Sequence, residues 1–374
     1  MEPESRPTNA AIIEPSQYLP GRLRFHFLLA AVLLALAALV GTTKLSRADE
    51  NGVSFWIPGF FGSLAATPQQ PGWSVASIYY HADVSGAGNI ALSKEISIGQ
   101  FNPALNVDVN ANLHGVGNIG FIAPSYVFGT AFFGGQASVS VLAAYGRNEG
   151  ALNASIGGTL AGIPLPNRTI NLQQTTWGLG DLAPMFAMRW NAGVNNYMSY
   201  ITGDIPVGLY HSSNLANMGL GHSAIDGGVG YTYFDPKTGH EFSVVTGLTG
   251  NLENTSTNYT SGIDWHIDWA ASQFLTKQVQ VGLVGYVYDQ ISPDRGCAPQ
   301  LCPFESRVAG IGPQFGYIFP ISPTLQGYIN LKAYAEFDHA SRPDGWNAWV
   351  TFVISPAALT PAPPALVTKA PPRY

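Results

Sequence analysis

The sequence predicts an all-β protein, a transmembrane antiparallel β-barrel, from two observations. Only 11% of its 374 residues are charged, yet no apolar run after residue 50 reaches the roughly 18 residues that a membrane helix needs. Segments with a period of two recur along the chain, with apolar side chains on one face and polar side chains on the other. Lipid outside and water inside a barrel explains both faces. Half-buried strands of a soluble all-β protein are the alternative.

The alternation is most informative in residues 263–272, where one predicted face carries two tryptophans and the other carries ionisable groups. These groups are Asp264, His266 and Asp268. Residues 105–114, 325–336 and 346–354 repeat the pattern. A strand of a soluble sandwich does not usually separate tryptophans from charges in this way, so a wall between lipid and water is favoured.

Turn signals from Gly, Pro and Asn divide the chain into about twelve predicted strands. These are residues 73–84, 104–128, 132–147, 181–191, 195–207, 226–235, 240–251, 263–275, 278–290, 307–319, 324–336 and 345–354. Short turns alternate with longer connections, and both termini lie at the short-turn end, as in bacterial outer-membrane barrels. Fourteen strands are the alternative, because residues 148–180 have room for another hairpin around Leu152 to Leu160.

The N-terminal residues 1–48 are predicted to be a leader that contains a signal peptide. Arg22 and Arg24 precede 14 apolar residues, Phe27 to Val40, and Ser46-Arg47-Ala48 supplies small residues for cleavage. Since this apolar run is too short to span a bilayer, we expect export to the outer membrane of a Gram-negative cell with a cleaved signal peptide. A short membrane anchor is the alternative.

The predicted barrel comprises residues 49–354, and the Pro- and Ala-rich residues 355–374 are predicted to be a disordered tail. We expect Cys297 and Cys302 to form a disulfide after export, because the chain has no other cysteine. Two thiolates with no histidine nearby do not complete a metal site, so we expect no metal and no cofactor. The formal charge of -6 and the lack of a basic stripe argue against nucleic acid as a partner.

A series of short motifs begins at Gly178-Leu179-Gly180-Asp181. It continues through residues 203–210, 217–221, 230–233, 258–262, 285–290 and 311–314. In order and spacing these motifs resemble the outer-membrane proteins named for the meta-pathway of phenol degradation, over about residues 50 to 355. The resemblance implies an outer-membrane β-barrel that transports aromatic or other hydrophobic compounds. Val207 stands where the family usually has Thr, and the cysteine pair is outside the recurrent pattern, so the substrate stays open.

The predicted strand phases point a set of polar and ionisable side chains into the lumen, along a candidate solute path. The set is Asp108, His114, Arg189, Asp264, His266, Asp268, Lys332, Tyr334 and Glu336. Mixed charges of this kind hydrate a pore, and a lumen closed by salt bridges among them is the alternative. A metal or acid–base role for the three groups around His266 is disfavoured, because alternate residues of a strand lie about 6.5 to 7 Å apart. We therefore predict a solvated pore wall.

The sequence His211-Ser212-Ser213-Asn214 is the only signal for an enzyme. Outer-membrane phospholipases and lipid A deacylases use a His-x-Ser-Asn stretch in which the histidine activates the serine. Here the tetrapeptide falls where a loop should begin, and no third group can be named. We predict a non-enzymatic channel for uptake of small hydrophobic or aromatic compounds, with the lipid bilayer, such solutes and the outer-membrane assembly machinery as partners. A lipid hydrolase and a plugged structural barrel are the alternatives.

Overall fold

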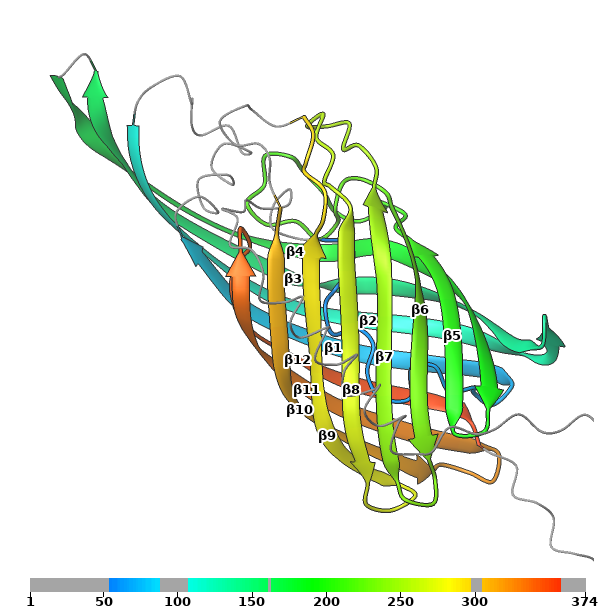
Figure 1. The fold of residues 1–374 in the computed structure, drawn as a ribbon. Coiled ribbons are helices and arrows are strands. Elements are labelled where there is room, and N and C mark those ends of the chain that lie inside the picture. Colours follow the sequence, from blue (N-terminus) through cyan, green and yellow to red (C-terminus); the bar gives the residue numbers. More distant parts are fainter. Residues whose placement is uncertain (1–53, 88–106, 161–162, 297–304, 358–374) are drawn as a thin grey trace, which may run out of the picture. The chain divides into compact units, whose positions relative to one another are not determined.

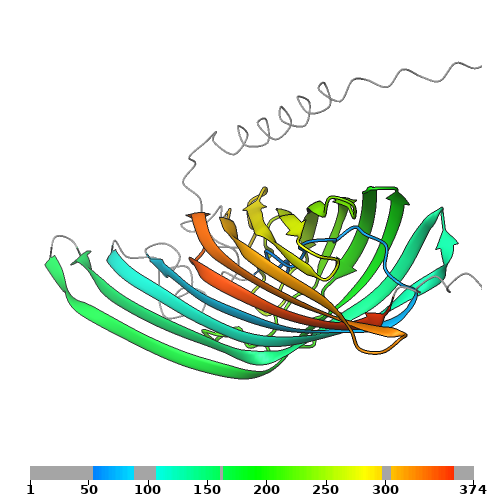
Figure 2. The same ribbon diagram turned by 90° about the horizontal axis from the view of Figure 1, so that it is seen from below.

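The computed structural model describes residues 54–87, 107–160, 163–296 and 305–357. In this part of the chain twelve strands form one closed antiparallel barrel, in which each strand pairs with its sequence neighbour and β1 closes on β12 (Figures 1 and 2). The strands are β1 (Gly72–Ala87), β2 (Val107–Phe132), β3 (Gly135–Leu160), β4 (Ile163–Ala192), β5 (Asn195–Gly203), β6 (Ala224–Asp235), β7 (His240–Asn251), β8 (Asp264–Phe274), β9 (Val279–Gln290), β10 (Arg307–Pro320), β11 (Leu325–Ala340) and β12 (Asp344–Pro356). The predicted fold class and strand number are confirmed. None of the described residues forms a helix long and apolar enough to cross a membrane.

Side chains along the strands alternate between the inner and the outer face of the barrel, as the sequence predicted. Along β8, Asp264, His266 and Asp268 are buried, and Trp265 and Trp269 on the opposite face are partly exposed. Elsewhere the outer face carries exposed apolar side chains such as Trp73, at 69%, and Val229, at 58%. Such side chains are stable on the surface of a barrel because lipid, not water, covers them.

Two strands are much longer than predicted. Residues 148–180 do not form an extra hairpin; they extend β3 to Leu160 and start β4 at Ile163. The extension is stabilised by its own apolar face, since Leu152, Ala154 and Ile170 are buried together. The glycines and asparagines that suggested a loop are accommodated as cross-strand partners in the ladder, where the two strands are bonded almost continuously.

Residues 54–71, which we call the lumen segment, belong to no strand and run through the inside of the barrel. Near one end, Arg342 in the β11–β12 connection donates from Nη1 to Ser54 Oγ at 3.2 Å. At the other end, Gln69 N donates to Gln136 Oε1, close to the β2–β3 turn, at 2.7 Å. Trp56 is 4% exposed. Sequence analysis assigned these residues to the barrel domain without a role.

The leader, the cysteine pair and most of the expected tail lie outside the described residues. Strand β12 runs to Pro356, two residues into the segment predicted as tail. The ladder continues there because Leu325 pairs with Pro356 and Gln326 with Ser355.

A substitution at Gly312 can test how closely β10 packs against β11. A Cβ placed there would lie 1.8 Å from the carbonyl oxygen of Ala333 on the neighbouring strand β11. We predict that Gly312→Ala lowers the free energy of unfolding by roughly 1–3 kcal/mol, as overpacking does. Urea titration of the refolded barrel, followed by its heat-modifiable migration on gels, measures the change. The matched variant Gly250→Ala, with its nearest atom 3.9 Å away, should keep the parental midpoint. Equal midpoints for both variants would contradict the close approach.

Candidate functional site

Asp268 and Lys332 bind the main chain of the lumen segment at residues 59–61. Asp268 accepts hydrogen bonds from Gly59 N at 2.8 Å and Phe61 N at 3.1 Å. Lys332 Nζ donates to the carbonyl oxygens of Gly59, Phe60 and Phe61 at 2.6, 3.3 and 3.3 Å. Both side chains are buried, at 2% and 6% exposure, and the backbone of residues 59–61 supplies the hydrogen bonds that these two buried charges need. Together they fix the course of the segment across the barrel.

Gly59 is the residue type that this turn requires. Its φ is 85°, a left-handed conformation that glycine adopts without strain. A Cβ at this position would also lie 2.9 Å from the ring of Tyr334 on β11. The Tyr334 hydroxyl donates to the Gly59 carbonyl at 3.4 Å.

Other strands hold the segment further along. Glu241 on β7 accepts from Leu64 N at 3.0 Å, and Arg189 on β4 donates from Nε to the carbonyl of Ala65 at 3.2 Å. With Asp268 on β8 and the β11 residues, these contacts come from widely separated strands of the wall. The lumen segment therefore crosses the interior and is bonded on several sides.

An aromatic cluster buries the start of the segment. Trp56 stacks on His266 with ring centroids 3.8 Å apart and lies 6.0 Å from the ring of Tyr200. His266 Nε2 is 2.9 Å from Asp226 Oδ2, and both residues are buried, at 1% and 0% exposure. Sequence analysis predicted a solvated wall here. The structure differs because the lumen segment covers this face and excludes water from it.

The remaining predicted lumen residues have separate surroundings. His114 is exposed and lies 2.9 Å from Asp83. Asp264 accepts from Asn251 Nδ2 at 2.9 Å, and Glu336 accepts from the Tyr286 hydroxyl at 2.7 Å. Asp108 lies in β2, but its side chain is outside the described set, as are Cys297 and Cys302. No group of three or more His, Cys, Asp or Glu suited to a metal occurs among the described residues.

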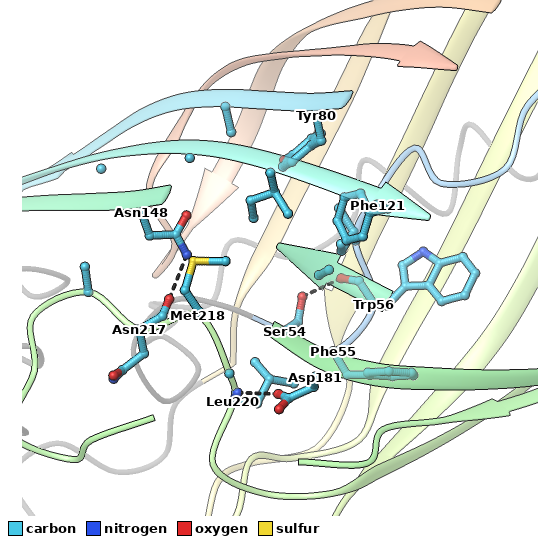
Figure 3. Close-up of a pocket in the computed structure, with 18 of the residues that line it drawn as sticks. Ser54, Phe55, Trp56, Tyr80, Phe121, Asn148, Asp181, Asn217, Met218 and Leu220 are labelled. Atoms are coloured by element: carbon cyan, nitrogen blue, oxygen red, sulfur yellow. Dashed lines mark hydrogen bonds between the residues drawn. The ribbon is translucent and has the colours of Figure 1, made fainter. Parts of the chain in front are cut away.

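A cavity of about 370 Å³ lies between the lumen segment, strands β1 to β4 and the connection from β5 to β6 (Figure 3). All four strands contribute to the lining, and each includes a run of three alternate residues: Tyr80, Ala82 and Val84 from β1; Ile119, Phe121 and Ala123 from β2; Ser140, Leu142 and Ala144 from β3; Asp181, Ala183 and Met185 from β4. All but two of these twelve side chains are apolar or aromatic, while His114, Asn148 and Glu149 add polar groups to the lining. The volume and lining suit a small apolar molecule.

Two carboxyl groups line the cavity where the β5–β6 connection (residues 204–223) meets β4. Asp181 accepts from Gly208 N at 2.7 Å. It also accepts from Leu220 N at 2.6 Å (Figure 3). Asp204, just beyond the end of β5, also lines the cavity. Burial, with a smaller contribution from the charge of Asp181, raises the pKa of Asp204 to about 8.

The His-x-Ser-Asn stretch lies in the same connection. Ser213 Oγ is 3.4 Å from His211 Nδ1, and both residues are exposed. No ion pair joins His211 to a carboxylate among the described residues. In the part of the chain that the structure describes, no carboxylate takes the place of the third group that orients the histidine in hydrolases.

Sequence reasoning found the polar half of the interior and missed the apolar half. It looked for strands with one polar face, whereas Ile119, Phe121 and Ala123 are apolar residues on the inner face of β2. The signal available was a strand with apolar residues on both faces, which indicates burial on both sides.

Comparison with known proteins agrees with this architecture. A family model described as "Putative MetA-pathway of phenol degradation" matches residues 97–352. No curated protein matches the chain. The structure of the COG4313 outer membrane channel from Pseudomonas putida F1 is similar, with 12% identity, a TM-score of 0.54, and coverage of 78% of this chain and 98% of that chain. That likeness shows the fold of an outer-membrane channel.

Two further structures cover much of the chain at lower similarity. A Pseudomonas aeruginosa FadL homologue has 11% identity and a TM-score of 0.36, and covers 84% of this chain and 98% of its own. The CymD monoaromatic hydrocarbon channel has 8% identity and a TM-score of 0.30, with coverage of 76% and 88%.

Asp268→Asn tests the attachment of the lumen segment. The amide has one acceptor oxygen instead of two, and its NH₂ group would face a backbone donor. Because hydrogen bonds to a charged group contribute roughly 1.5–3 kcal/mol, we expect the segment to detach more often. Limited chymotrypsin digestion of the folded barrel should cut within the segment faster than in the parent. Asp235→Asn, in the β6–β7 turn, should not alter cleavage. Unchanged cleavage in Asp268→Asn would contradict the assigned role.

Proposed function

We propose that this chain, which belongs to the family described as the MetA-pathway of phenol degradation, is an outer-membrane channel for small apolar compounds, aromatic ones included. The observation that carries the proposal is the apolar cavity inside the barrel, between the lumen segment and β1 to β4. A channel that only hydrated its solutes would need a polar lining, as porins have.

The shape of the cavity supports small, neutral solutes. A volume of about 370 Å³ is at the lower end of the range for small-molecule sites. Aromatic side chains from Phe121, Tyr80 and Trp56 offer faces for stacking (Figure 3). Polar groups line the cavity at Asp181 and also at Glu149 and Glu336, so a solute with one polar atom has hydrogen-bonding partners beside the apolar surface.

Filling the cavity should reduce uptake. Ala183→Trp places an indole among the lining residues, and we expect entry of a small aromatic solute into cells that carry the variant to fall towards that of cells without the protein. Accumulation of radiolabelled toluene in Gram-negative cells measures this. The matched variant Val229→Trp puts the same side chain on the outer face of β6, where the residue is 58% exposed, and should behave as the parent. Undiminished uptake in Ala183→Trp would contradict passage through the cavity.

A plugged scaffold is the second candidate, and the lumen segment favours it. The two candidates differ in a direct measurement. If the barrel is a channel, cells that carry it take up toluene faster than cells without it. If it is a plugged scaffold, cells with and without the protein take up toluene at the same rate.

The hydrolase alternative predicts loss of phospholipid cleavage on replacing Ser213. We expect Ser213→Ala and the parent to be equally inactive on phospholipid vesicles and equally active in solute uptake, because the His211–Ser213 contact is long and exposed. Fatty-acid release by the parent that disappears in the variant would establish the enzyme instead.

A further inference from the structure

The strand pairing of the barrel wall is interrupted where β5 ends. Strand β4 pairs with β5 only from Met185 to Ala192, and one bridge, Leu182 with Ile205, follows. From Asp181 back to Ile163, β4 continues along β3 with no described strand on its other side. The next strand of the wall, β6, starts at Ala224, opposite the end of β5. Between β4 and β6 the ladder is therefore interrupted on this side of the barrel.

The β5–β6 connection closes the interruption, mainly through side chains of β4. Beyond the Leu182–Ile205 bridge, Leu209 N donates a main-chain hydrogen bond to the Leu179 carbonyl at 2.9 Å. Gln174 Oε1 accepts from Leu215 N at 2.6 Å, in addition to the two bonds that Asp181 accepts. Bonds of this kind can be released without opening the ladder of the wall.

The β5–β6 connection is a single layer of chain between the cavity and the outer face of the barrel. On its inner side, Leu215, Met218 and Leu220 line the cavity. Ile205 and Val207 do not line it and are 46% and 60% exposed. The neighbouring outer residues are apolar as well: Trp177 and Leu179 on β4, at 61% and 63%, and Ile225 on β6, at 57%. One layer of chain separates an apolar cavity from an apolar exterior.

An exit along the barrel axis is blocked by the lumen segment. On that side the cavity is bounded by Trp56, Ile57 and Phe60 of the lumen segment, which Asp268 and Lys332 hold in place. A solute leaving axially would have to displace this buried, multiply bonded segment.

We propose that neutral, lipid-soluble compounds leave the cavity sideways, between β4 and β6, into the outer leaflet of the membrane, when the β5–β6 connection moves away from β4. This inference rests on the proposed uptake function and adds its exit route. Polar and charged solutes are excluded from the route because its outer side offers them no hydrogen bonds.

A disulfide can lock the connection to β4. A Cβ built at Gly178 lies 3.5 Å from Leu209 Cβ, within the range of disulfides. The variant is Gly178→Cys/Leu209→Cys, made with Cys297→Ser and Cys302→Ser so that no other thiol competes. The matched control is Ser74→Cys/Ser125→Cys in the same background, which joins β1 to β2 where the two hydroxyls are 2.6 Å apart. Mass spectrometry with and without reductant establishes that each disulfide has formed.

The readout is the entry of N-phenyl-1-naphthylamine, a neutral aromatic probe that fluoresces in lipid, into Gram-negative cells producing each variant. We expect the oxidised Gly178–Leu209 lock to reduce entry to that of cells without the protein, reductant to restore it, and the control disulfide to have no effect. A fully oxidised lock that admits the probe as fast as the parent overturns the lateral route and leaves uptake standing. A parent that admits the probe no faster than empty cells overturns the proposed function and this inference with it.

A second variant tests the same route without a disulfide. Asp181→Asn removes one of the two acceptors that hold Gly208 N and Leu220 N, so the connection should detach more often and probe entry should become faster than in the parent. Equal or slower entry, at equal amounts of folded barrel, overturns the route.

Discussion

The interior of this barrel depends on satisfying the backbone of residues 59–61. A chain that crosses a lumen away from water must find partners for its amide and carbonyl groups. Asp268 supplies two acceptors and Lys332 three hydrogen bonds from one ammonium group, so a single pair of buried charges serves five backbone groups. The charges in turn need the backbone, because each would be costly to bury alone. Segment and wall therefore stabilise each other.

This mutual dependence divides the barrel into two halves with different chemistry. Strands β7, β8 and β11 present carboxylates and an ammonium group to the lumen segment. Strands β1 to β4 present apolar side chains to the cavity on its other side. The segment thus separates a filled region, which holds the buried charges, from an open cavity with a largely apolar lining. A uniform pore would have neither the dry cluster around Trp56 nor a cavity suited to stacking.

The outline of the wall could be predicted from sequence because lipid and water impose opposite demands on alternate residues. The period of two in β8 and β11 identified which side chains point inward, Asp268 and Lys332 among them. It could not show what covers those side chains, since the lumen segment has no periodicity and is bonded through its main chain. The extension of β3 and β4 was missed for a related reason: Leu152 and Ile170 are buried by each other and by Leu215, a residue distant in sequence.

The position of the lumen segment also constrains the order of assembly. It precedes β1, and β1 is the strand that meets β12 to close the barrel. Its partners Asp268 and Lys332 lie on β8 and β11, which are synthesised long after it. Once the β1–β12 seam is complete, eleven registered pairs block entry from the side. A segment that already lies against the open sheet when that seam forms is enclosed by it and does not have to thread in through the end of a closed barrel.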